Sequence, residues 1–102
     1  MNAPNDTARR EAIAMKLYVA GNNPYSLRAR ANLDSLLAQL DHETVVDIVD
    51  VMRAPEVALT EGILATPALV VRIGDTSLLF IGDLSQREEV LDALRRHTGE
   101  AA

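Results

Sequence analysis

The sequence predicts an α/β fold whose elements follow the order βαβαββα. Three observations support this order. Leucines at helical spacing separate two apolar runs, a Thr-Pro pair precedes a third run, and a Gly-Asp pair divides that run from a fourth. The 102 residues, of which 48% are hydrophobic, suit one small domain with a core of ordinary size.

The first half of the chain predicts a strand, a helix and a second strand. Apolar residues alternate over Ile13–Val19, and the strand is expected to stop at Gly21. Asn23 is a common helix-capping residue, and Pro24 suits the first helical turn because its missing N–H is not needed there. The β-branched run over residues 45–51 is typical of a parallel strand, so the unit is expected to be a right-handed βαβ crossover.

The second half predicts a short helix and an antiparallel hairpin. The helix covers residues 54–59, and Gly62 is well placed to end it. Pro67 is expected to open a strand that runs to residue 73. Gly74-Asp75 then fits a two-residue type II′ turn, which prefers glycine first, before a strand over residues 76–81.

A final helix is predicted from its end signals. Ser85 and Glu88 have the spacing of a capping box, which makes Ser85 the expected N-cap. Acidic residues follow at the start of the helix, Arg95 and Arg96 lie near its end, and Gly99 follows them. These charges complement the helix dipole.

The Thr66-Pro67 bond is predicted to be cis. Only X-Pro bonds adopt the cis form at a cost of about 0.5–1 kcal/mol. A proline before the third strand of a βαβαββα chain is the thioredoxin-like pattern, in which the loop after the first strand carries Cys-x-x-Cys. Here that loop, residues 21–26, offers amides and hydroxyls, and the chain contains no cysteine. Thiol-disulfide exchange is therefore excluded.

Charge and hydropathy narrow the partners and the location. A net charge of -5 argues against a nucleic-acid partner, which requires a basic surface. The longest apolar run is far shorter than the ~20 residues of a membrane span, and the start of the chain lacks a signal-peptide core. We expect a cytoplasmic domain over residues 13–98, with tails at residues 1–12 and 99–102.

Four blocks, in order and at compatible spacing, closely resemble the KaiB family of cyanobacterial clock proteins. They are KLYVAGN at residues 16–22, SLRA at 26–29, ILATPAL at 63–69 and IGDLSQRE at 81–88. The resemblance implies a non-catalytic protein that binds the ATPase ring of a KaiC-type protein. In the full clock, the family's assembly with KaiC sequesters KaiA.

The resemblance also implies two folds. KaiB proteins rest in a βαββααβ fold, often as a tetramer, and bind partners as thioredoxin-like monomers. Gly74-Asp75 stands here in place of the proline run and paired arginines of many KaiB sequences. Ala93 and Arg95 replace glycine and aspartate, and both are better helix formers, by up to about 1 kcal/mol relative to glycine. We expect the thioredoxin-like monomer to dominate, with the other fold as a minor, dimeric or tetrameric state.

Four residues are candidates for partner binding near the first helix and before the last one. Asn22 and Asn23 lie where the catalytic cysteines of a thioredoxin would be, although turn formation and capping also explain them. Arg28 matches a family block and could meet an acidic surface, or be solvated. Asp83 lies in the last block, where a structural role is the alternative.

Three acidic residues on or after the second strand are also candidates for partner binding. Asp47 stands where clock KaiB proteins often have lysine, and Glu61 with Gly62 replaces an acidic-lysine pair, so a KaiA-type partner is doubtful. Asp47 and Asp50 lie on a predicted edge strand. They could contact a partner strand or simply protect the edge from aggregation.

No motif predicts catalysis, a cofactor or a metal site. His42 and His97 lack the spacing of metal ligands, and no Ser-His-Asp grouping or phosphate loop is present. We therefore expect no enzyme activity. Two other functions remain open: a stand-alone adaptor domain similar to that of clock-output histidine kinases, and a redox-inactive thioredoxin relative that binds an unrelated peptide.

Overall fold

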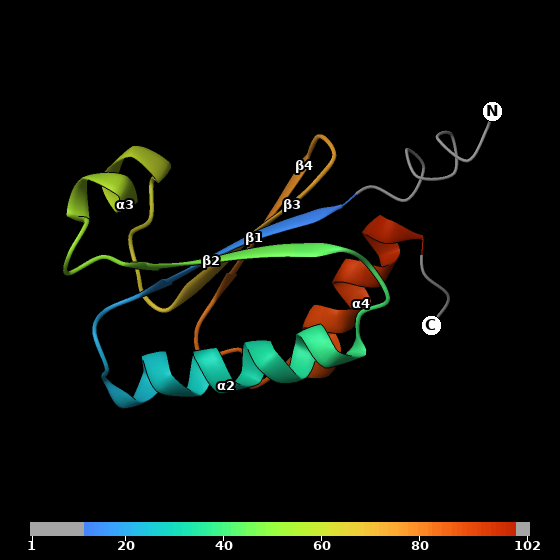
Figure 1. Cartoon of the computed structure of the whole chain (residues 1–102), viewed down its shortest axis with the longest axis horizontal. Helices are drawn as coiled ribbons and strands as arrows, with labels where there is room; N and C mark the ends of the chain where they lie inside the picture. Colours follow the sequence, from blue (N-terminus) through green and yellow to red (C-terminus); the bar gives the residue numbers. More distant parts are fainter. Residues whose placement is uncertain (1–11, 100–102) are drawn as a thin grey trace.

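The computed structural model describes residues 12–99 and confirms the predicted element order. Of the predicted tails, residues 1–12 and 99–102, all but residues 12 and 99 lie outside the described residues. The elements are β1 (Ile13–Val19), α2 (Pro24–Gln39), β2 (Thr44–Asp50), α3 (Pro55–Glu61), β3 (Ala68–Ile73), β4 (Thr76–Ile81) and α4 (Arg87–Thr98), shown in Figure 1.

The strands form one sheet in the order β2-β1-β3-β4. β1 and β2 are parallel, as the predicted βαβ crossover requires, whereas β3 pairs antiparallel with both β1 and β4. Gly74 occupies the first position of the β3–β4 turn with φ 58°, a conformation that glycine adopts without steric cost. β2 and β4 are consequently the two edges of the sheet.

One face of the sheet carries the core. Figure 1 shows α2 and α4 on the same side of the sheet, with α3 away from them at one end. Alternate side chains of β1 and β3 point toward α2 and α4 because successive side chains of a strand face opposite ways. The buried core on this side contains Ile13, Met15, Leu17, Val19, Leu33, Leu36, Leu69, Val71, Leu91 and Leu94.

The other side of the sheet, called the second face here, is only partly covered. By strand alternation and register it presents Ala14, Lys16, Tyr18, Val45, Asp47, Val49, Ala68, Val70, Arg72, Ser77, Leu79 and Ile81. Tyr18 and Ala68 are buried, but Val45, Leu79 and Ile81 are more than half exposed. A mixed apolar and charged surface therefore remains open along both edge strands.

The connection from α3 to β3 agrees with the prediction. Gly62 ends α3 in the left-handed region, with φ 74°. The Thr66-Pro67 bond is cis, and the carbonyl of Pro67 accepts a 2.9 Å hydrogen bond from the backbone N–H of Gly82. This bond extends the β3–β4 ladder by one pair.

The predicted capping box of the last helix is wrong. Ser85 donates its backbone N–H to Oδ1 of Asp83 at 3.0 Å, in a turn where Leu84 has φ 64°. The helix begins only at Arg87, after Gln86, whose side chain makes no capping bond. The predicted charges and the terminal Gly99 are found as expected.

Ala93 and Arg95, which the sequence singled out as helix formers, both lie inside α4. Arg95 also reaches the end of α2, where its Nη2 donates to the carbonyl of Gln39 at 3.3 Å. Arg95 therefore joins the two core helices as well as favouring the helix.

Candidate functional site

The loop that would carry cysteines in a thioredoxin is here a helix cap. Oδ1 of Asn23 accepts the backbone N–H of Ser26 at 2.8 Å, and its Nδ2 donates to the carbonyl of Ala20 at 2.9 Å. The buried hydroxyl of Ser26 accepts the backbone N–H of Ala20 at 3.1 Å. Asn23 is thus held by structural bonds, whereas the neighbouring Asn22 is also exposed.

Asp50 fixes the ends of β1 and β2 together. Its Oδ1 accepts backbone N–H groups from Gly21 and from Met52, each at 3.0 Å. The bond from Gly21, followed by that from Met52, lowers the pKa of Asp50 below its ordinary value. Asp50 therefore has a structural role at the ends of the two strands.

Two predicted residues, Arg28 and Asp83, are brought together. Nε of Arg28 lies 3.1 Å from Oδ2 of Asp83, and the guanidinium lies 4.6 Å from the centroid of the Tyr25 ring. Nδ2 of Asn32 donates to the backbone carbonyl of Asp83 at 2.8 Å. Hydrogen bonds from the Ser85 side chain, then from Arg28, lower the pKa of Asp83.

This cluster, Asn22, Tyr25, Arg28 and Asp83, is called the α2 surface below. Tyr25 is 62% exposed, and the side chain of Arg28 is 52% exposed. Sequence reasoning missed Tyr25, although its position three residues before Arg28 on a helix would have placed the two side chains together.

The other two candidates lie on a different part of the molecule. Asp47 is on β2, directly opposite Lys16 in the register of the second face. Glu61 ends α3 and lines a cavity of about 270 Å³ with Lys16 and Arg72. Lys16 and Arg72 were missed as site residues, although strand alternation assigns both to this face.

Tyr18 lies beneath this part of the second face. Its hydroxyl is buried and has no hydrogen-bond partner within residues 12–99. Burial, and secondarily the negative charge of Glu61, raises the pKa of Tyr18. The buried hydroxyl of Tyr18 therefore favours its neutral form.

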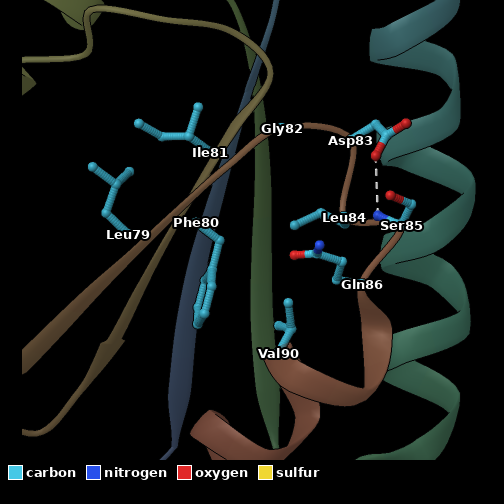
Figure 2. Close-up of a pocket in the computed structure, with 9 residues that line it drawn as sticks. All are labelled: Leu79, Phe80, Ile81, Gly82, Asp83, Leu84, Ser85, Gln86 and Val90. Carbon is cyan, nitrogen blue, oxygen red and sulfur yellow. Dashed lines mark hydrogen bonds between the residues drawn. The ribbon is translucent and has the colours of Figure 1, made fainter.

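A cavity of about 460 Å³ lies beside β4 and the loop that leads to α4. Figure 2 shows Leu79 and Ile81 on one side of β4, and Phe80 on the other side, where it points toward Val90. The dashed line in the same view is the hydrogen bond from the Ser85 backbone N–H to Oδ1 of Asp83, so the Asp83 carboxylate lies next to Ser85.

Residues 12–99 contain no group of three or more acidic or histidine side chains that could hold a metal ion. Within the same span, none of the helices is both long and apolar enough to cross a membrane. The α2 surface offers a cation, an aromatic ring and amide groups, which suit recognition of a protein surface.

The fold defines the class as a thioredoxin-like domain, and the chain has no cysteine with which to exchange disulfides. The N-terminal domain of Synechococcus elongatus SasA has the same fold, with a TM-score of 0.73 at 16% identity, covering 89% of this chain and 87% of that chain. A mutant thioredoxin from Halobacterium salinarum has a TM-score of 0.71 at 17% identity, covering 96% of this chain and 85% of that chain. The chain belongs to the KaiB family, whose domain matches residues 16–96.

Relatives support the same assignment. The circadian clock oscillator protein KaiB of Gloeothece citriformis is 41% identical over 86 residues, covering 83% of this chain and 81% of the relative. That of Thermostichus vulcanus is 38% identical over 97 residues, covering 91% and 90%. The family is regulatory and non-catalytic, which confirms the prediction that the chain is not an enzyme.

Proposed function

We propose that this chain is a cytoplasmic regulator that binds the ATPase ring of a KaiC-type protein in a clock, a timer or a stress response. Membership of the KaiB family supports the partner. The chain has the thioredoxin-like fold, and the family resemblance assigns partner binding to the form with that fold.

The observation that carries the proposal is the preorganised Arg28 of the α2 surface. Its guanidinium is held by Asp83 and by the ring of Tyr25, yet half of the side chain remains exposed. A side chain already fixed in the free protein loses less conformational entropy on binding. Arg28 and Tyr25 are also residue types that commonly dominate the binding energy of protein interfaces.

Size-exclusion chromatography with the KaiC homologue of the same organism, in ATP and in ADP, tests the proposal. We expect co-elution in at least one nucleotide state. Arg28→Ala should weaken binding, whereas Arg96→Ala, which removes an exposed arginine of α4, serves as the matched control. Absence of binding in both states would refute the ring-binding regulator and the adaptor-domain alternative together.

We further infer that the thioredoxin-like fold is the main resting form. The regular Gly74-Asp75 hairpin supports this, as do the helix-forming Ala93 and Arg95 inside α4. The βαββααβ fold is then a minor state. It remains accessible because two packings of one sequence can differ by only a small free energy.

A KaiA-type partner is not part of the proposal. The negative charge of Asp47 occupies the exposed edge strand β2, and Glu61 adds a second negative charge on the second face. The two carboxylates alter the charge that a partner of the clock KaiB proteins would meet at these positions.

A further inference from the structure

The second face carries a cavity of about 270 Å³ that is lined mostly by charged side chains. Ala14, Lys16, Val70 and Arg72 contribute to it from the sheet, and Glu61 contributes from the end of α3. In the β1–β3 register Lys16 lies two positions from the residue that faces Arg72, so the two cations are diagonal neighbours on adjacent strands. The cavity therefore offers two positive groups and one negative group around an apolar floor.

The charged side chains of this cavity do not neutralise one another. Within residues 12–99, neither Lys16 nor Arg72 forms an ion pair with Glu61 or with another carboxylate. Their charged atoms therefore lie more than 4.0 Å from those of Glu61, which leaves room for the polar groups of a ligand between them. One positive charge remains in excess here, although the chain as a whole carries a net charge of -5.

We propose that this cavity binds a small acidic amino acid, of the glutamate or aspartate kind. The two carboxylates of such a ligand match Lys16 and Arg72, and its ammonium group matches Glu61. Pockets for drug-sized ligands usually measure about 300–1,000 Å³. A cavity of about 270 Å³ therefore suits a smaller molecule, and the single net negative charge of the ligand cancels the excess positive charge of the site.

The three charged residues recognise different parts of this ligand. The guanidinium of Arg72 presents a planar pair of N–H donors that suits a carboxylate, whereas the ammonium of Lys16 acts as a compact point charge. Glu61 repels an anion that has no cationic group, such as phosphate or a simple dicarboxylate. The cavity should therefore distinguish an acidic amino acid from other small anions.

Asp47 limits the affinity of this cavity. It lies on β2 directly opposite Lys16, so its carboxylate competes with the ligand for the ammonium group. The inference does not depend on the ring-binding proposal, because α2 lies on the other side of the sheet (Figure 1). Salt should weaken the binding, since the cavity is open to solvent and its charges are screened.

Titration of the isotope-labelled chain with L-glutamate, followed by backbone NMR at constant ionic strength, tests the inference. We expect the amide signals of Lys16 and Arg72 to shift with one dissociation constant on the order of 1 mM, as for a ligand of this size. Arg72→Gln should weaken binding about tenfold because it removes one charge-assisted pairing. Arg96→Gln removes an exposed cation of α4, on the other side of the sheet, and should bind as the wild type does.

Glutarate, which has both carboxylates of glutamate but no ammonium group, isolates the contribution of Glu61. The wild type should bind glutamate about tenfold more tightly than glutarate, whereas Glu61→Gln should bind the two equally. Asp47→Asn should strengthen glutamate binding, because it removes the competing charge.

The comparison of ligands on the wild type needs no variant, so a folding defect cannot affect it. Absence of any glutamate-dependent shift would overturn the inference. Equal binding of glutamate, glutarate and inorganic phosphate would also overturn it, because the cavity would then be an unspecific anion patch. So would unchanged glutamate binding by Arg72→Gln.

Discussion

Arg28 and Asp83 form an ion pair, with 3.1 Å between Nε and Oδ2, although 55 positions separate them in the sequence. The pair joins the first half of α2 to the loop between β4 and α4. It fixes the guanidinium over Tyr25, and it holds the loop that sets where α4 begins. One contact thus links the candidate binding surface to the second half of the fold.

Removal of Asp83 should destabilise the protein more than removal of Arg28. Asp83→Ala loses the ion pair and also the bond from the Ser85 N–H, whereas Arg28→Ala loses the ion pair and the ring contact. We expect the larger drop in the urea midpoint for Asp83→Ala. Asp92→Ala, an exposed aspartate of α4, is the control. Equal midpoints for the Asp83 and Arg28 variants would contradict this reading of the loop.

Stability should fall in acid because of Asp50 and Asp83. Both carboxyls have a folded-state pKa below the ordinary value of 3.8. Their contribution is therefore complete above that value and is lost as the pH falls through the folded-state pKa. The free energy of unfolding, measured by urea titration from pH 6 downward, should begin to decrease at about pH 4.

Asp50→Asn isolates one of these two groups. The amide oxygen can still accept the N–H groups of Gly21 and Met52, but the side chain no longer titrates. The variant should lose less stability than the wild type between neutral and acidic pH. If the unfolding free energies of the two proteins fell equally with pH, Asp50 would not contribute to the loss of stability in acid.

The contact of α4 with the sheet should dominate the stability of the second half. Leu94 is fully buried, so Leu94→Ala should lower the free energy of unfolding by about 2–5 kcal/mol. Leu64 is 96% exposed, and Leu64→Ala should change it by no more than about 0.5 kcal/mol. If urea titrations showed a similar loss of unfolding free energy for both variants, the contact of α4 with the sheet would not be the main source of stability in this half.

The resting fold can be read from backbone NMR shifts of residues 68–81. In the thioredoxin-like fold these residues form the β3–β4 hairpin, so their Cα and Cβ shifts should be those of strands. Helical shifts over this segment in the dominant species would show that the βαββααβ fold prevails instead.

The sequence predicted the elements well because each was indicated by local chemistry. Alternation over β1, the Asn23 cap and the Gly74-Asp75 turn depend on neighbouring residues alone, and all three are present. Ser85 was misassigned because two local motifs compete there. The carboxylate of Asp83 binds the Ser85 N–H in a turn, so the N-cap moves from Ser85 to Gln86 and the helix starts one residue later than predicted.

The candidate site was predicted only as separate residues. Arg28 and Asp83 were both named, but no local pattern indicates that α2 packs beside the loop after β4. Asp50 does lie in the edge strand β2 as predicted, but the sequence does not show that two backbone N–H groups converge on its carboxylate. Such pairings depend on tertiary contacts.

Hydrogen exchange on the complex with a KaiC-type ATPase ring tests the ring-binding proposal. We expect slower exchange in the ring-bound protein over residues 22–28, the part of the α2 surface around Tyr25 and Arg28, with β4 unaffected. Protection confined to other elements, or no change when the ring is added in either nucleotide state, would contradict it.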